Sequence, residues 1–233
     1  MPTRTLLLFD IDGTLLDAAG AGRAGWERAT AELFGDALDF TGVTMAGQVD
    51  NAIFAAAAER AGWSDYEEEH RRLREHYPYR LAEELDRRRG RVRALPGVLP
   101  LLDALAQAAR AAAGPVVGCL TGNQRTGAAM KLKAVGIDPD RFVVEAYGDE
   151  ADTRPQLVQL AMQRYAQQYG HPPDPRRVVV IGDTPHDIES ALAHRCYALG
   201  VATGQHDIAE LTAAGADRVL PDLRDPAVLW ELI

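Results

Sequence analysis

The chain has few cysteines and no long apolar run. Its two cysteines, Cys119 and Cys196, offer neither the spacing of a metal-binding motif nor a disulfide framework. We expect both thiols to be free and buried, which is consistent with the cytoplasm. The apolar run at residues 6–9 is interrupted by Asp10, so it is too short to be a signal peptide or a membrane span. We therefore expect a cytoplasmic protein without membrane contact.

Basic residues are also in the minority. The 25 Lys and Arg residues stand against 34 Asp and Glu residues, which gives a net charge of −9. This balance gives no support to general binding of a nucleic-acid backbone, and any anionic substrate needs a local positive site. The 233 residues, 47% of them hydrophobic, suit one medium-sized core with a smaller inserted unit. The oligomeric state is not indicated.

A short buried strand at the amino terminus delivers carboxylates to its end. Four large apolar residues precede Asp10, Asp12 and Gly13, as in a strand that stops at an acidic turn. Residues two apart in an extended chain point to the same side, so both carboxylates can face one small volume. Crowded carboxylates repel each other unless a cation or a shared proton relieves them, which favours a hard divalent metal such as Mg2+.

The pattern of expected secondary structure changes near residue 92. Residues 18–91 favour helices alone, and later residues alternate between helices and strands. This alternation predicts an α/β fold: a Rossmann-like parallel sheet with helices on both faces, made from residues 1–17 and 92–233. The expected helices are 22–34, 50–61, 66–89, 98–112, 124–135, 155–169, 187–193 and 208–214, and the expected strands are 5–9, 116–120, 142–145, 178–181, 197–201 and 218–220.

Two further strand ends carry polar residues. The strand at 116–120 runs into Thr121, Gly122 and Asn123, and a hydroxyl before a helix start is a good arrangement for binding an anion. The strand at 178–181 runs into Asp183 and then Asp187. Each feature alone also fits a plain turn or a helix cap, with Asp187 as the capping residue.

Taken in order, these motifs resemble those of the haloacid dehalogenase (HAD) superfamily of phosphohydrolases. Asp-Ile-Asp-Gly-Thr at residues 10–14, a strand-ending Thr, a basic residue and Gly-Asp-x-x-x-Asp at residues 182–187 follow one another as in that family. The resemblance spans residues 5 to about 203 and is greatest to the phosphoglycolate phosphatase-like branch. It implies that residues 18–91 form the helical cap domain inserted after the first strand.

The resemblance also implies a mechanism. Asp10 would attack the phosphorus of a small phosphorylated metabolite and form an aspartyl-phosphate, while Asp12 would act as general acid and then general base. Mg2+ would be held by Asp10, Asp183 and the main-chain carbonyl of Asp12. The remaining implied roles are phosphoryl binding by Thr121 and Arg154, and support from Asp187, Gly122 and Asn123.

The basic residue departs from the family pattern. Family members usually place a Lys there, whereas this chain has Arg154 followed by Pro155. Arginine keeps the charge but presents a planar fork in place of a compact ammonium. Lys131 or Lys133 are alternatives, although Lys-x-Lys within a helix is more typical of exposed positions. We assign the role to Arg154.

Specificity is expected in the cap. The candidates for substrate binding are Gly47 and Gln48, in a glycine-led turn, and Arg23. The simpler interpretations are a helix-start turn capped by Asp50 and a solvated helix face. The sequence therefore does not identify the substrate.

Three alternatives to a Mg2+-dependent phosphatase share part of this pattern. A β-phosphoglucomutase-like phosphosugar mutase shares the motifs and the cap type, and a catalytically idle phosphate-binding relative remains open because of Arg154. A receiver-type regulatory domain also uses an Asp that becomes phosphorylated, with a Thr, a basic residue and Mg2+, but its acidic residues all precede the Thr. Here Asp183 and Asp187 follow Thr121, which argues against a receiver.

Overall fold

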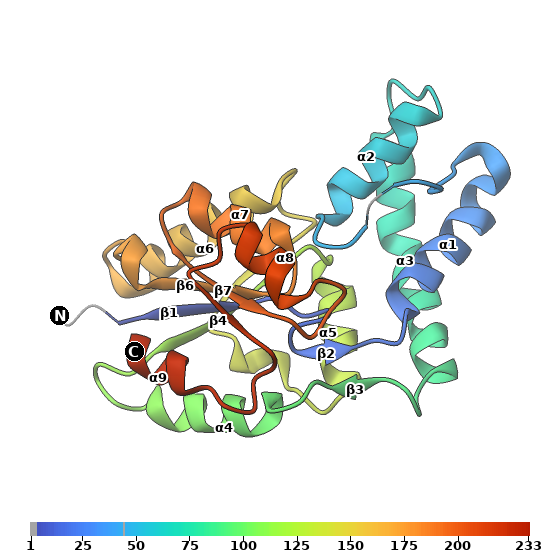
Figure 1. The fold of residues 1–233 in the computed structure, drawn as a ribbon. Helices are drawn as coiled ribbons and strands as arrows, with labels where there is room; N and C mark the ends of the chain where they lie inside the picture. Colours follow the sequence, from blue (N-terminus) through green and yellow to red (C-terminus); the bar gives the residue numbers. More distant parts are fainter. Residues whose placement is uncertain (1–3, 44) are drawn as a thin grey trace.

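The centre of the computed structural model, which describes residues 4–43 and 45–233, is a sheet of six parallel strands. The strand order is β5-β4-β1-β6-β7-β8; Figure 1 labels the inner strands β4, β1, β6 and β7. This architecture confirms the predicted α/β fold with a parallel sheet. The strands are β1 (Leu6–Phe9), β4 (Val116–Thr121), β5 (Val144–Tyr147), β6 (Val178–Gly182), β7 (Tyr197–Val201) and β8 (Arg218–Leu220).

Alternate residues of the central strands face opposite layers of helices. In β1, Leu7 and Phe9 belong to one apolar cluster, and Leu6 and Leu8 belong to the other. Helices on both sides exclude water from these strands, which is why the strands are apolar throughout. One face is covered by α6 (Arg154–Tyr169), α7 (Pro185–Ala193) and α8 (Ile208–Ala213), and the other by α4 (Val98–Ala108), α5 (Arg125–Ala134) and α9 (Ala227–Leu232).

The chain reverses its direction of travel across the sheet at β1. After β1 it builds β4 and β5 on one side, and then it crosses to build β6, β7 and β8 on the other. The carboxyl ends of β4, β1 and β6 therefore meet at the switch point, where open α/β sheets form a crevice for ligands. All three strands carry the polar residues that the sequence singled out.

Residues 18–43 and 45–91 form a separate layer of helices beside the carboxyl ends of the strands (Figure 1). We call this segment the helical insertion; it contains α1 (Ala21–Phe34), α2 (Asp50–Arg60) and α3 (Glu67–Arg87). The two connections to the sheet pair with each other, because β2 (Leu16–Asp17) runs antiparallel to β3 (Arg93–Ala94). The division into two domains at residues 17 and 92 stays a prediction.

Several element boundaries differ from the expected ones. The strand expected at 142–145 begins at Val144, because residues 139–141 form a 3-10 turn. The helix expected to begin at Asp187 begins at Pro185, with Thr184 as its cap. The helix expected to reach residue 112 ends at Ala108. The β2–β3 pair and the carboxyl-terminal helix α9 were missed, since two-residue strands and a six-residue helix carry almost no periodic signal.

Two expectations from composition can be compared with the structure. Cys119 and Cys196 are both buried and free, as expected. Within residues 4–43 and 45–233, every helix is too short or too polar to cross a membrane.

The helical insertion has an aromatic core that provides a test of its packing. Phe54 is fully buried, stacks on His70 at 4.6 Å between ring centroids and also packs against Phe34 and Tyr66. We expect Phe54→Ala to lower the free energy of unfolding by about 3–5 kcal/mol through lost burial and a new cavity. Chemical denaturation measures this change. Tyr79→Ala, at an aromatic side chain that is 69% exposed, is the control, and an equal effect of both changes would contradict the packing.

Candidate active site

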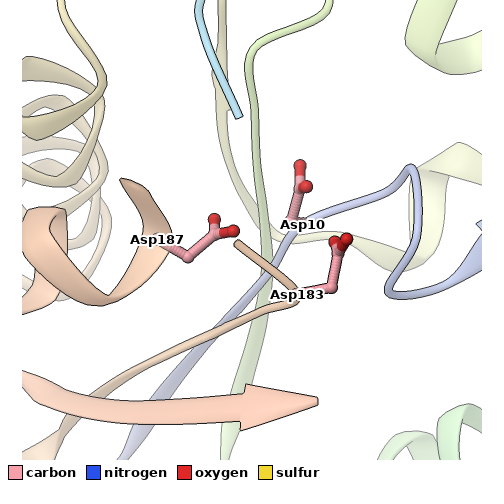
Figure 2. Close-up of side chains that lie close together, drawn as sticks. All are labelled: Asp10, Asp183 and Asp187. Atoms are coloured by element: carbon pink, nitrogen blue, oxygen red, sulfur yellow. The ribbon is translucent and has the colours of Figure 1, made fainter. Parts of the chain in front are cut away.

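Three buried carboxylates converge where the strands end. Asp10 follows β1, Asp183 follows β6, and Asp187 lies in the first turn of α7. One oxygen of each lies within 4.8 Å of one oxygen of each of the others. Figure 2 shows the three side chains close together, with the Asp187 carboxylate directed from its helix toward Asp10 and Asp183. The predicted convergence of Asp10 and Asp183 is therefore present in the structure.

Arg154 lies between two of these carboxylates. Its Nη2 is 3.0 Å from Oδ1 of Asp10 and 2.5 Å from Oδ1 of Asp187, and all three side chains are buried. Its Nη1 donates to the carbonyl of Gly47 at 3.2 Å. The position follows from local sequence, because Thr153 caps α6 in a capping box and Arg154 is the first residue of that helix. The structure thus brings Arg154 to the predicted place.

Asp187 has a different local role from the capping residue considered for it. Thr184 is the cap of α7, and Asp187 is the third residue of the helix. Its Oδ2 accepts hydrogen bonds from the backbone N–H of Thr184 at 3.1 Å and from the Thr184 hydroxyl at 2.7 Å. Asp187 is therefore fixed by its own helix on one oxygen and by Arg154 on the other.

Lys131 is buried in the site, so its interpretation as an exposed helix lysine was wrong. Its Nζ lies 2.6 Å from Oδ2 of Asp12 and 2.6 Å from Oδ1 of Asn123. Lys133, two residues further along the same helix, is exposed as expected. Lys131 and Arg154 do not compete for one role, because each faces a different carboxylate. The sequence signal was the polar Lys-x-Lys pair, which does not tell which lysine faces inward.

The turn after β4 is held by several close contacts. Thr121 is fully buried at the strand end, and its hydroxyl accepts a hydrogen bond from the Asn123 side-chain amide at 2.7 Å. The same amide nitrogen donates to Oδ2 of Asp12 at 2.8 Å. The carbonyl of Gly122 accepts from the backbone N–H of Asp50 at 2.8 Å. A side chain at Gly122 would collide with the backbone oxygen of Gln48, so only glycine allows this approach.

The residues predicted to bind substrate from the cap differ in how closely they contact the site. Gly47 lies against Arg154, and the Gln48 amide nitrogen is 3.1 Å from Nε2 of His186. Arg23 borders the pocket, but its side chain is 67% exposed and pairs with Glu27. Asp50 is not a side-chain cap of α2, whose capping position is Val49. The Asp50 carboxylate instead accepts the backbone N–H of Gln124 at 2.7 Å, which ties the helical insertion to the turn after β4.

Burial and crowding shift the acid–base properties of the site. Burial raises the pKa of Asp10 to about 6, against the opposing effect of Arg154. Burial, with the charges of Asp10 and Asp187, raises the pKa of Asp183 to about 8. Burial also raises the pKa of Asp50 to about 7. Burial by itself would lower the pKa of Arg154, but Asp10 and Asp187 raise it above its ordinary value.

These charges and donors fit a divalent cation. Within the site, Asp10, Asp12, Asp183 and Asp187 face two cations, Arg154 and Lys131, so two negative charges remain when all are ionised. Among the described residues, Oδ2 of Asp10 and Oδ2 of Asp183 accept no side-chain hydrogen bond, whereas both oxygens of Asp187 are engaged. Hard carboxylate oxygens are the ligands that Mg2+ prefers. Asp10 and Asp183 are thus better placed than Asp187 to bind a divalent cation.

The site opens into a pocket of about 640 Å³ between the sheet and the helical insertion. Its size suits a small ligand. Because the lining comes from elements far apart in the sequence, no local pattern could have identified all of it. The lining residues that the sequence did not single out include Trp26, Ile53 and Tyr77 of the insertion and Thr203, Gly204 and Gln205 after β7.

The fold and the site define a class of protein: a doubly wound α/β protein with an aspartate-rich site at the switch point of its sheet. The family model of the haloacid dehalogenase-like hydrolases matches residues 5–195. The chain therefore belongs to the haloacid dehalogenase-like hydrolases and is an enzyme of that family. No curated protein matches the chain significantly.

Solved structures share the whole fold. A hydrolase from Pseudomonas syringae is 25% identical, with a TM-score of 0.69 over 99% of each chain. A predicted phosphoglycolate phosphatase from Haemophilus somnus is 20% identical, with a TM-score of 0.67 over 99% of each chain. A protein from Thermotoga maritima, described provisionally as a β-phosphoglucomutase, is 21% identical, with a TM-score of 0.64 over 98% of this chain and 100% of that one. At these levels of identity, the last two structures show a shared fold and nothing about the substrate.

The buried Asp50 makes the stability of the protein depend on pH. Because its folded pKa of about 7 lies above its ordinary value of 3.8, the folded state takes up a proton between these values, and stability falls as pH rises toward 7. At most about 4 kcal/mol is involved. We expect Asp50→Asn, which keeps an acceptor for Gln124, to lose less stability than the wild type between pH 5 and pH 8.

Denaturant titrations at several pH values, in the presence of a chelator, measure this difference. Asp10 and Asp183 contribute equally in both proteins, so the comparison isolates Asp50. Asp65→Asn, at an exposed carboxylate, is the control and should follow the wild type. Identical slopes for Asp50→Asn and the wild type would contradict the assignment.

Proposed function

We propose that the protein is a Mg2+-dependent phosphatase that hydrolyses a small phosphorylated metabolite through an aspartyl-phosphate. The observation that carries this proposal is the pair Asp10 and Asp12. Asp10 is buried against Arg154, while the Asp12 side chain is 40% exposed and borders the pocket. Two carboxylates at one strand end, in such different environments, suit one nucleophile and one acid–base group.

In the first half of the proposed reaction, an oxygen of Asp10 attacks the phosphorus. The bond from phosphorus to the ester oxygen breaks as the new P–O bond forms, and Asp12 gives its proton to the leaving alcohol. Arg154 and the Thr121 hydroxyl would hold phosphoryl oxygens, a proposal supported by their position at the border of the same pocket. Their positive charge and hydrogen-bond donor would stabilise the charge that spreads over these oxygens.

In the second half, water replaces the alcohol. Asp12 takes a proton from the water as the water oxygen attacks the phosphorus, and the bond between phosphorus and Asp10 breaks. Phosphate leaves and Asp10 returns as a carboxylate. Asp187 would support both halves, because its Oδ1 contacts the same Nη2 of Arg154 that contacts Asp10 and so helps to fix the guanidinium.

Mg2+ would be held by Asp10, Asp183 and the main-chain carbonyl of Asp12. When bound, it supplies positive charge that offsets the crowded carboxylates and the phosphoryl oxygens. Thr14 orients one ligand, since its hydroxyl donates to Oδ1 of Asp183 at 3.0 Å. Gly13 and Gly204 leave space for the Asp183 carboxylate, because a side chain at either position would overlap it.

The helical insertion is proposed to act as a cap that limits access of water to the site. Gly47 and Gln48 contact Arg154 and His186 directly, and Gly47, Gln48 and Arg23 border the pocket. A small phosphorylated metabolite fits a pocket of about 640 Å³. A cytoplasmic location is proposed with this function, and two buried free thiols support it.

The direct test is phosphate release from a panel of phosphorylated metabolites with and without Mg2+. The panel includes phosphoglycolate, sugar phosphates and nucleotides. We expect metal-dependent release by the wild type and a loss of at least about 1,000-fold in Asp10→Asn, because an amide cannot form the acyl-phosphate. Asp65→Asn is the control and should retain full activity.

Product analysis separates a phosphatase from a mutase. Free phosphate indicates hydrolysis, whereas β-glucose 1-phosphate converted to glucose 6-phosphate without net phosphate release indicates the mutase. The fold likeness to the Thermotoga maritima protein makes this substrate part of the panel. Full turnover by Asp10→Asn would exclude the proposed nucleophile.

Metal binding can be tested without turnover. We expect Mg2+ to raise the thermal midpoint of the wild type, because a ligand at 100 times its Kd adds about 2.7 kcal/mol to the free energy of unfolding. Asp183→Asn removes a proposed ligand and should lose most of this gain. In a chelator, the same variant should be at least as stable as the wild type at pH 8, because burial and neighbouring charges disfavour ionised Asp183.

Calorimetry with and without Mg2+ measures both effects. Asp65→Asn again serves as the exposed-carboxylate control. An equal rise in the thermal midpoint for Asp183→Asn and the wild type would place the metal elsewhere.

A further inference from the structure

Lys131 contacts the acid–base side of the site, and the proposed mechanism leaves it unused. The side chain projects from α5 and is 4% exposed, and its Nζ lies 2.6 Å from both Oδ2 of Asp12 and Oδ1 of Asn123. A buried ammonium without partners is costly, so these two acceptors fix where it lies. Lys131 is therefore part of a three-residue cluster with Asp12 and Asn123.

The two carboxylate oxygens of Asp12 have different hydrogen-bond partners in this cluster. Oδ2 accepts from Lys131 at 2.6 Å and from the Asn123 side-chain amide at 2.8 Å. Oδ1 accepts no side-chain hydrogen bond from the residues at 4–43 and 45–233. The hydrogen bonds from the Lys131 ammonium and the Asn123 amide fix the orientation of the Asp12 carboxylate, because rotation of the carboxylate would break both of them.

The surroundings of Lys131 keep its ammonium on this cluster. A methyl group placed at Gly22 would lie 2.9 Å from Nζ, so glycine at this position of α1 makes room for the ammonium. The same methyl carbon at Gly22 would lie 3.6 Å from the hydroxyl of Tyr77. Asp50 is a further ionisable group near Lys131, and its carboxylate accepts a hydrogen bond from the backbone N–H of Gln124. Asp12 and Asn123 are therefore the partners that Lys131 contacts directly.

We propose that Lys131 is the positioning residue for Asp12: with Asn123 it fixes Oδ2 and leaves Oδ1 to transfer the proton. This inference rests on the proposed phosphatase function. Oδ1 gives its proton to the ester oxygen as the bond from that oxygen to phosphorus breaks and the bond from Asp10 to phosphorus forms. It regains a proton from the water whose oxygen then attacks the aspartyl-phosphate.

The proposal predicts a dependence on the leaving group. A misplaced Asp12 matters most when the departing oxygen needs a proton, and least when the leaving group is a strong acid. Phenyl phosphate and 4-nitrophenyl phosphate are suitable substrates, because they are similar in size and 4-nitrophenol is much the stronger acid. The value of kcat/KM covers the steps up to departure of the phenol, which isolates the first half of the reaction.

The experiment compares Lys131→Met, Asp12→Asn and the wild type on both esters. General acid catalysis contributes about 10²- to 10⁴-fold, so we expect Lys131→Met to lower kcat/KM at least about tenfold on phenyl phosphate. The loss on 4-nitrophenyl phosphate should be less than about threefold. Asp12→Asn should show the same selectivity, and adding Lys131→Met to it should change the selectivity no further. Lys133→Met, at an exposed position of the same helix, should match the wild type.

Other outcomes separate this inference from the proposed function. Equal losses on both esters in Lys131→Met, beside selective losses in Asp12→Asn, would overturn the positioning role and leave the phosphatase intact. If the wild type releases phosphate from neither ester and from no member of the metabolite panel, the proposed function is overturned.

Crystal structures of the wild type and Lys131→Met then decide the positioning role without turnover. A carboxylate of Asp12 that has rotated away from Asn123 in the variant supports the role. An unchanged carboxylate overturns it.

Discussion

The crowding of negative charge at the switch point of the sheet is the constraint on which this site depends. Parallel strands end side by side, so the carboxylates that follow β1 and β6 are forced into one small, buried volume. Arg154 relieves part of the repulsion by contacting Asp10 and Asp187 together. The remaining charge raises the pKa of Asp183, after burial itself. A site with this charge balance suits a divalent cation.

The helical insertion and the sheet share this site through short contacts. Gly47 accepts from Arg154, and Asp50 contacts the turn after β4 through both its backbone N–H and its carboxylate. Each contact joins a residue of the insertion either to Arg154, at the start of α6, or to the turn after β4. A movement of the insertion relative to the sheet would therefore alter the surroundings of Arg154 and Thr121 together. This coupling is a physical reason for proposing that the insertion acts as a cap.

The two cations have separate surroundings, and sequence reasoning treated them as alternatives. Arg154 begins a helix directly after a capping residue, so its position could be inferred from the chain next to it. Lys131 lies in the last turn of α5 without a capping motif beside it, so only packing decides whether it is buried. The weak amphipathic pattern around Lys131 and Lys133 could not identify the inward lysine. Asn123 was found from its place after the strand, but its bridge to Asp12 depends on the fold.

The sequence by itself determined the α/β architecture, the order of the motifs and the placement of Asp10, Thr121 and Asp183 at strand ends. These features follow from apolar runs that stop at polar turns, which is local information. Tertiary structure alone decided which residues line the pocket, the burial of Lys131 and the contact of Asp50 with the turn after β4. Those contacts join segments far apart in the sequence, such as Lys131 and Asp12, which are 119 residues apart, and they arise only when helices pack against the sheet.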